Sequence, residues 1–229
     1  EEKNIPFALF VKGDVVYIDF SNVTFITPFC LLGILSYCRR ITASTGNRVR
    51  IQCLAEQTYA YLERMKFFAN GSDWIELVGD YSGVIHWGVN PQSLNLIEIV
   101  RIDEQKDKGS QDVMRAVNLL RERGKEILSV WLNKDILEIG EFVTVLSEIA
   151  QNIFEHSHDF GYVALNKYEI GDKKRLNLSI LDSGVGLFNS VMRKLKKDGI
   201  TLKHPNDYLS YPFTEGMARS GGGGLFRVF

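Results

Sequence analysis

The sequence has few of the residues that mark disulfide-rich, zinc-binding or membrane-spanning proteins. It contains only three cysteines, Cys30, Cys38 and Cys53, and no two of them form the CxxC pair of structural zinc sites. Each lies in an apolar segment, so we expect free, buried thiols in a reducing compartment. The longest apolar run, at residues 26–35, is too short to span a bilayer. We therefore expect a soluble, cytoplasmic protein without a membrane partner.

The chain also lacks an excess of either charge. It has 27 basic and 28 acidic residues, which gives a formal net charge of −1. Charge therefore provides no signal for nucleic acid as a direct partner. No internal repeat or low-complexity segment is present. With 229 residues, of which 45% are hydrophobic, the chain is long enough for one large or two small domains with a substantial core.

The most regular pattern is helical and lies in residues 139–155. Apolar residues recur there at the period of an amphipathic helix: Ile139, Phe142, Val143, Leu146, Ile149, Ala150, Ile153 and Phe154. Glu148 and Asn152 are four residues apart on another face of this helix, and Glu155 follows three residues later. By themselves these three residues fit an ordinary solvated face.

Two glycine-containing segments follow the helix. The apolar run 176–181 predicts a strand that delivers the chain to Asp182, and the next four residues read Ser-Gly-Val-Gly. A carboxylate at the end of a buried strand, followed by alternating glycines, suits a backbone that approaches a flat ligand closely. Four consecutive glycines, 221–224, precede Leu225 at an expected helix start. Backbone N–H groups at such a start can bind phosphates.

In this order the three segments resemble the motifs of the GHKL ATPases, the nucleotide-binding domains of gyrase, heat-shock chaperone and histidine-kinase type. Glu148-xxx-Asn152 resembles the N box, Asp182-x-Gly184-x-Gly186 the first glycine box and Gly221–Leu225 the second. The likeness covers roughly the last 130 residues. It implies an α/β sandwich in which helices cover one face of a mixed sheet.

The resemblance also implies that the chain binds ATP or ADP with Mg²⁺. It gives Glu148 the role of the general base, and Asn152 that of a Mg²⁺ ligand through its amide oxygen. It gives Asp182 a hydrogen bond from the adenine amino group, and a buried carboxylate there would reject the guanine carbonyl. The further nucleotide contacts that it implies are His156, Gly184, Gly186, Arg219, Gly221, Gly222, Gly223, Gly224 and Leu225. One departure is Glu155, since many kinases have a basic residue at that position.

Residues 187–220 lie between the two glycine boxes, where the family has a lid. Six basic residues in this segment could face a triphosphate. However, Leu187, Val191 and Leu195 predict an amphipathic helix, so we interpret the lysines as a solvated face. Since the family fold continues with a helix and a strand after the second glycine box, we expect the natural chain to extend past Phe229.

The first 70 residues predict a second, smaller α/β unit. Its elements are strands at residues 7–11 and 15–20, a helix at 28–45, a strand at 48–54 and a helix at 58–68. A Lys-Gly-Asp turn joins the first two strands, and Pro28 and Gly46 mark the two ends of the first helix. This order predicts a mixed sheet with helices on one side.

Residues 18–35, IDFSNVTFITPFCLLGIL, resemble the strand-loop-helix segment of the STAS domain, the fold of anti-anti-sigma factors. In that family a loop Asp-Ser pair supplies a phosphorylated serine, and here the two positions are Thr27 and Pro28. Proline has no hydroxyl, and we interpret Thr27 as a helix N-cap in preference to a substitute phosphoacceptor. The likeness therefore implies a docking module without the phosphoserine switch.

Residues 81–95 contain glycine and proline among polar residues, which predicts the boundary between the region that resembles a STAS domain and the region that resembles a GHKL domain. We predict a STAS-like docking or regulatory domain at residues 1–95 and a GHKL ATP-binding domain at 96–229. The elements expected before the N-box helix are a strand at 96–102, a charged loop at 103–110, a helix at 111–131 and a break at 133–135.

Our leading hypothesis is an ATP-binding regulator whose nucleotide state, through binding or slow hydrolysis, controls a protein partner by way of the STAS-like domain. Two alternatives stay open: a protein-serine kinase resembling the anti-sigma factors, and an ATP-gated dimer clamp, which requires a homodimer. Histidine autokinase activity fits poorly, because none of the four histidines lies in an acceptor motif of the HExxxP kind. Whether the chain is an enzyme is open at this point.

Overall fold

A computed structural model describes residues 8–84, 95–103, 118, 120–132, 136–156, 159–171 and 173–211. The fold is mixed α/β, with one mixed and one antiparallel sheet. Contacts divide the chain into two units, Glu1–Val100 with Val163–Leu181, and Arg101–Tyr162 with Asp182–Phe229. This division groups residues by proximity rather than by independent folding, so the domain boundary at residue 95 stays a prediction.

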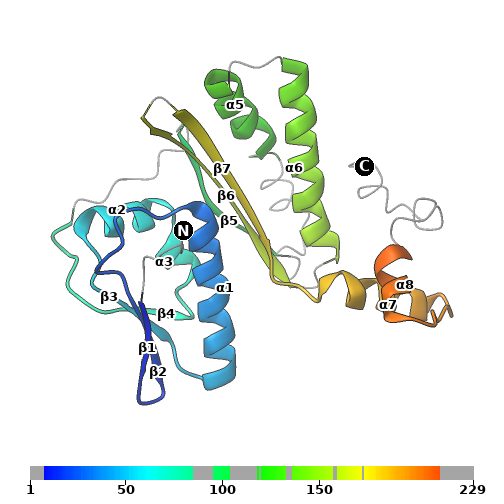
Figure 1. Ribbon diagram of the computed structural model, residues 1–229, viewed down its shortest axis with the longest axis horizontal. Helices are drawn as coiled ribbons and strands as arrows, with labels where there is room; N and C mark the ends of the chain where they lie inside the picture. Colours follow the sequence, from blue (N-terminus) through cyan, green and yellow to red (C-terminus); the bar gives the residue numbers. More distant parts are fainter. Residues whose placement is uncertain are drawn as a thin grey trace. The chain divides into compact units, whose positions relative to one another are not determined.

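The first unit contains a four-stranded sheet in the order β1-β2-β3-β4 (Figure 1). Its strands are β1 (Ala8–Lys12), β2 (Val15–Asp19), β3 (Val49–Gln52) and β4 (Ile75–Leu77). β1 and β2 are antiparallel, whereas β2, β3 and β4 are mutually parallel. Gly13 has a φ of 64° in the two-residue turn between β1 and β2, which confirms the predicted hairpin.

Helix α1 (Pro28–Thr45) has the predicted boundaries. The Thr27 hydroxyl accepts a hydrogen bond from the Cys30 N–H at 3.3 Å, and Pro28 occupies the first helical turn. Gly46 ends the helix with a φ of 77°, and its N–H donates to the carbonyl of Thr42. The apolar face of α1 is buried, and the helix packs against β3 and α3 (Phe67–Asn70). Thr27 is therefore a helix N-cap, as interpreted from the sequence.

The helix predicted at residues 58–68 is instead two helices, α2 (Glu56–Arg64) and α3. Lys66 separates them in the left-handed conformation, with a φ of 58°. Met65 and Phe67 flank it, and both are fully buried. A continuous helix would direct residues two positions apart to different faces, so the break at Lys66 allows both side chains to enter the core.

A three-stranded sheet contains β5 (Leu96–Asp103), β6 (Phe160–Ile170) and β7 (Lys173–Asp182), with β6 in the middle. The strands predicted at 96–102 and 176–181 are confirmed as parts of β5 and β7. Within the first unit, β5 is attached to the segment around α3. The Ile99 N–H donates to the Met65 carbonyl at 3.0 Å, and the Asn70 side-chain amide donates to the Ile99 carbonyl at 3.2 Å.

The second unit contains the helices of the predicted nucleotide-binding region. They are a π-helix, η1 (Leu120–Gly124), followed by α5 (Lys125–Leu132), α6 (Ile136–His156), α7 (Gly186–Lys197) and α8 (Pro205–Ser210). α7 confirms the amphipathic helix predicted after the first glycine box, because Val191 and Leu195 are buried against Tyr208 of α8. Residues 104–117 and 133–135, where a loop, a helix start and a break are predicted, lie outside the described residues.

The three cysteines are free thiols, as expected, but only Cys38 is buried. Cys53 is exposed just after β3, where its φ of 58° turns the chain out of the sheet, and Cys30 is partly exposed. The expectation of three buried thiols is therefore wrong for Cys53 and Cys30. Among the described helices, none has the length and apolar character needed to cross a membrane.

Candidate functional site

The predicted N box lies on α6, which runs without interruption from Ile136 to His156. One helical turn therefore separates Glu148 and Asn152, about 6 Å along the helix axis. Glu148 is partly buried. The side chains of Asn152 and His156 lie outside the part of the chain that the structure describes.

The residue before Glu148 attaches the π-helix η1 to α6. Ser147 is almost fully buried, and its hydroxyl donates to the Val143 carbonyl at 2.8 Å. The same oxygen accepts a hydrogen bond from Nε of Arg121 at 3.3 Å. Sequence reasoning missed Arg121, because its position in a predicted helix carried no signal for a contact with α6. The contact fixes the N-terminal side of Glu148 against η1.

Asp182 is the last residue of β7, as the sequence predicts, but its side chain is exposed. Its Oδ1 accepts a hydrogen bond from the Gly184 N–H at 2.7 Å, which closes a turn directly after the strand. Gly186 follows with a φ of 77°, a conformation that favours glycine. The expectation of a buried carboxylate is wrong, because Asp182 caps its own loop at the surface.

One hydrogen bond brings this turn close to the end of α6. The Ser183 N–H donates to the Phe160 carbonyl at the start of β6, at 3.1 Å. Phe160 is only four residues beyond His156, the last residue of α6, so their Cα atoms are at most about 14 Å apart. The strands β6 and β7 separate the N-box helix from the first glycine box in the sequence, and this bond places the glycine box beside the segment that follows α6.

The second half of the predicted site cannot be placed in the same way. Arg219, Gly221, Gly222, Gly223, Gly224 and Leu225 lie outside the described residues. The structure therefore describes the backbone of both α6 and the first glycine box, and leaves the predicted phosphate contacts of the second glycine box as predictions.

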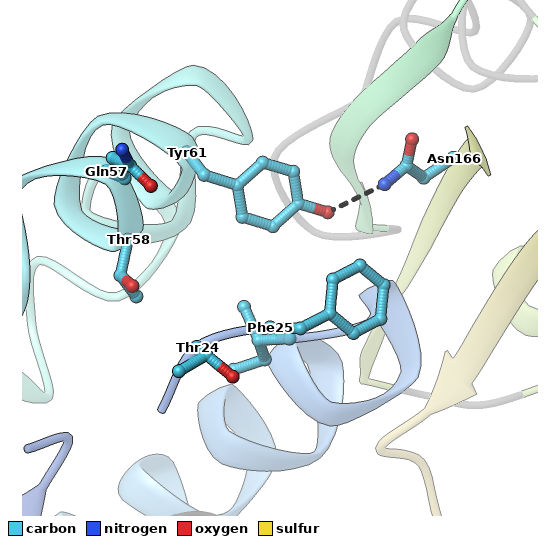
Figure 2. A pocket seen from close by; sticks show the side chains of 7 residues that line it. Thr24, Phe25, Gln57, Thr58, Tyr61 and Asn166 are labelled. Atoms are coloured by element: carbon cyan, nitrogen blue, oxygen red, sulfur yellow. Dashed lines mark hydrogen bonds between the residues drawn. The ribbon is translucent and has the colours of Figure 1, made fainter. Parts of the chain in front are cut away.

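A pocket of about 110 Å³ occurs in the first unit, where no site was predicted (Figure 2). It is lined by Thr24, Phe25, Ile26, Gln57, Thr58, Tyr61 and Asn166. The Asn166 amide donates to the Tyr61 hydroxyl at 3.1 Å, and burial raises the pKa of Tyr61 to about 12. Ligand pockets for drug-sized molecules measure about 300–1,000 Å³, so this pocket is too small for a nucleotide. Sequence patterns could not indicate it, because its walls come from three distant segments.

Comparisons of the chain with protein-family models, with curated proteins and with solved structures give no match.

Proposed function

We propose that the chain is an ATP-binding regulatory protein of the GHKL superfamily, whose nucleotide state controls a protein partner. The observation that carries the proposal is the hydrogen bond from the Ser183 N–H to the Phe160 carbonyl, which holds the first glycine box beside the segment that follows α6. Helix α6 carries Glu148 and Asn152 and ends four residues before Phe160, which is hydrogen-bonded to Ser183 beside Asp182. A nucleotide bound across these segments would have its base at Asp182 and its phosphates toward α6.

The residues of the two motifs have the chemistry that this nucleotide requires. The Asp182 carboxylate has a second oxygen, Oδ2, to accept a hydrogen bond from an adenine amino group while Oδ1 holds Gly184. Mg²⁺ prefers oxygen ligands, and the Asn152 amide oxygen is the ligand that we assign to it. Gly184 and Gly186 have no side chain that would hold their backbone away from the base.

The region before residue 95 would act as the STAS-like docking module. The Thr27 hydroxyl is engaged as the N-cap of α1, and the next residue is a proline. Both observations support a module that docks to a partner without a phosphorylation switch in this loop. The protein that docks to this module would be the partner that the nucleotide state controls.

Isothermal titration calorimetry of the chain with Mg²⁺-ATP, Mg²⁺-ADP and Mg²⁺-GTP tests the proposal. We expect binding of ATP and ADP, weaker binding after chelation of Mg²⁺, and no comparable binding of GTP. Equal affinity for ATP and GTP would remove the role assigned to Asp182. Absence of heat for all three nucleotides, checked by a thermal-shift assay on the same samples, would reject the nucleotide-binding function.

A protein-serine kinase is the second candidate. It is favoured by Glu148, which lies partly buried one turn before the assigned metal ligand on a helix that Ser147 and Arg121 fix. A general base needs such a fixed position. Release of phosphate, or its transfer to a serine of another chain, would separate this enzyme from a switch that only binds ATP.

A further inference from the structure

Strand β1 lies at the edge of the four-stranded sheet; it is apolar from Ala8 to Val11 and ends with Lys12. All five of its residues are exposed, and among the described strands it pairs only with β2. Leu9, Phe10 and Val11 are 48%, 39% and 66% exposed. Proteins normally protect such an edge, because its unpaired N–H and C=O groups can bind another strand.

The hairpin register shows which backbone groups of β1 do not bond to β2. Lys12 pairs with Val15 across the two-residue turn, which makes them a hydrogen-bonded pair. Bonded and non-bonded pairs alternate along an antiparallel ladder, so Phe10 and Ala8 also bond to β2. The N–H and C=O groups of Leu9 and Val11 therefore point away from β2, toward the open edge.

We infer that β1 pairs with β1 of a second copy of the chain, antiparallel and centred on Phe10. In this register Leu9 lies opposite Val11 of the second copy, so each N–H that points away from β2 meets a C=O that does the same. The two Leu9–Val11 pairs supply four backbone hydrogen bonds. Phe10 of one copy lies opposite Phe10 of the other in a pair without backbone hydrogen bonds. If the register shifted by one residue, N–H and C=O groups that point away from β2 in one copy would lie opposite groups that bond to β2 in the other, and these hydrogen bonds would be lost.

The side chains of β1 also match a second copy in this register. Leu9 pairs with Ile18, which is fully buried, so Leu9 and Val11 lie on the sheet face that carries the core. Pairing would extend this apolar layer from one copy into the other. On the other face, Phe10 stacks on Tyr17 with ring centroids 5.0 Å apart, and a second Phe10 would continue the stack. Each Lys12 would lie opposite Ala8, so the two ammonium groups stay apart.

Sedimentation velocity from about 1 to 200 μM tests the pairing, with Val11→Pro as the main variant. Proline removes the outward N–H of residue 11 and leaves the bonds between β1 and β2 intact. We expect a concentration-dependent dimer for the wild type and a dimer constant at least about 10-fold weaker for Val11→Pro, because the dimer loses two backbone donors. Phe29→Ser is the control, since Phe29 is 74% exposed on α1 of the same unit; it should leave the dimer unchanged.

A second variant and a cross-link cover the case in which Val11→Pro disturbs the hairpin. Leu9→Lys with Val11→Lys keeps the backbone donors but places four like charges at the seam, and we expect a monomer. Phe10→Cys, in a Cys53→Ser background, should form an intermolecular disulfide, because Cα atoms of a non-bonded antiparallel pair lie about 4.5 Å apart. A monomeric wild type, a dimer that tolerates both seam variants, or a dimer lost on Phe29→Ser would overturn the inference.

Discussion

Replacing Asp182 should change nucleotide selectivity as well as affinity, and the structure sets the size of the effect. A hydrogen bond to a charged group contributes about 1.5–3 kcal/mol. Asp182 is exposed in the unbound chain, so we take a value of about 2 kcal/mol, within the lower half of this range. Since 1.4 kcal/mol is a factor of ten, Asp182→Ala should bind Mg²⁺-ATP about 30-fold more weakly than the wild type.

Asp182→Asn separates the contact with the base from the contact within the turn. The amide oxygen of asparagine can keep the hydrogen bond that Oδ1 of Asp182 accepts from the Gly184 N–H. The NH₂ group then replaces Oδ2. This donor cannot bond to the adenine amino group, which is also a donor, but it can donate a hydrogen bond to the guanine carbonyl. We expect weaker ATP binding and stronger GTP binding, which should narrow the ATP:GTP preference by about tenfold or more.

Calorimetry with both nucleotides measures these effects, and Asp80→Ala is the matched control. Asp80 is an exposed aspartate that accepts the same kind of turn hydrogen bond, from the Ser82 N–H at 3.0 Å, and its replacement should leave nucleotide binding unchanged. Binding of ATP by Asp182→Ala within about threefold of the wild type would show that Asp182 does not bind the base. The full preference for ATP in Asp182→Asn would lead to the same conclusion.

Three further predictions concern other residues. Asn152→Ala should weaken Mg²⁺-dependent nucleotide binding, because it removes the assigned metal ligand. Glu148→Ala should leave nucleotide binding nearly intact and abolish phosphate release, because a general base acts only in the transition state. Binding and phosphate-release assays on both variants decide this, and hydrolysis at the wild-type rate by Glu148→Ala would show that the base is wrongly assigned. No phosphoserine or phosphothreonine should form within residues 1–60 on incubation with ATP. A stoichiometric phosphate on Thr27, found by intact-mass spectrometry, would contradict this. Hydrogen bonds from Ser21 and Gln52 lower the pKa of Asp19 to about 2, so its stabilising contribution is present above pH 4 and is lost as the pH falls toward 2; the difference in melting temperature between wild type and Asp19→Asn should shrink over that range.

The elements with strong local signals could be predicted from the sequence. Pro28 and Gly46 mark the ends of α1 because each favours one backbone conformation, and the structure places both ends there. The β1–β2 hairpin is likewise fixed by its turn. The strand before Asp182 and the helix of the N box are also where their periodicity puts them.

Features that depend on distant contacts could not be predicted. The break at Lys66 has no turn signal and arises because Met65 and Phe67 are both buried in the core. β4 is only three residues long and is defined by its parallel pairing with β3. The pocket beside Tyr61 needs Asn166, which is 105 residues away along the chain. For the candidate site, the sequence placed Asp182 correctly at the end of a strand but could not show that Gly184 would hold its carboxylate at the surface.

A crystal structure with Mg²⁺ and a non-hydrolysable ATP analogue would show whether ATP binds between α6 and the turn after β7. We expect the adenine amino group within hydrogen-bonding distance of the Asp182 carboxylate and the metal ion at the Asn152 amide oxygen. A nucleotide bound elsewhere, or a base with no contact to Asp182, would contradict it.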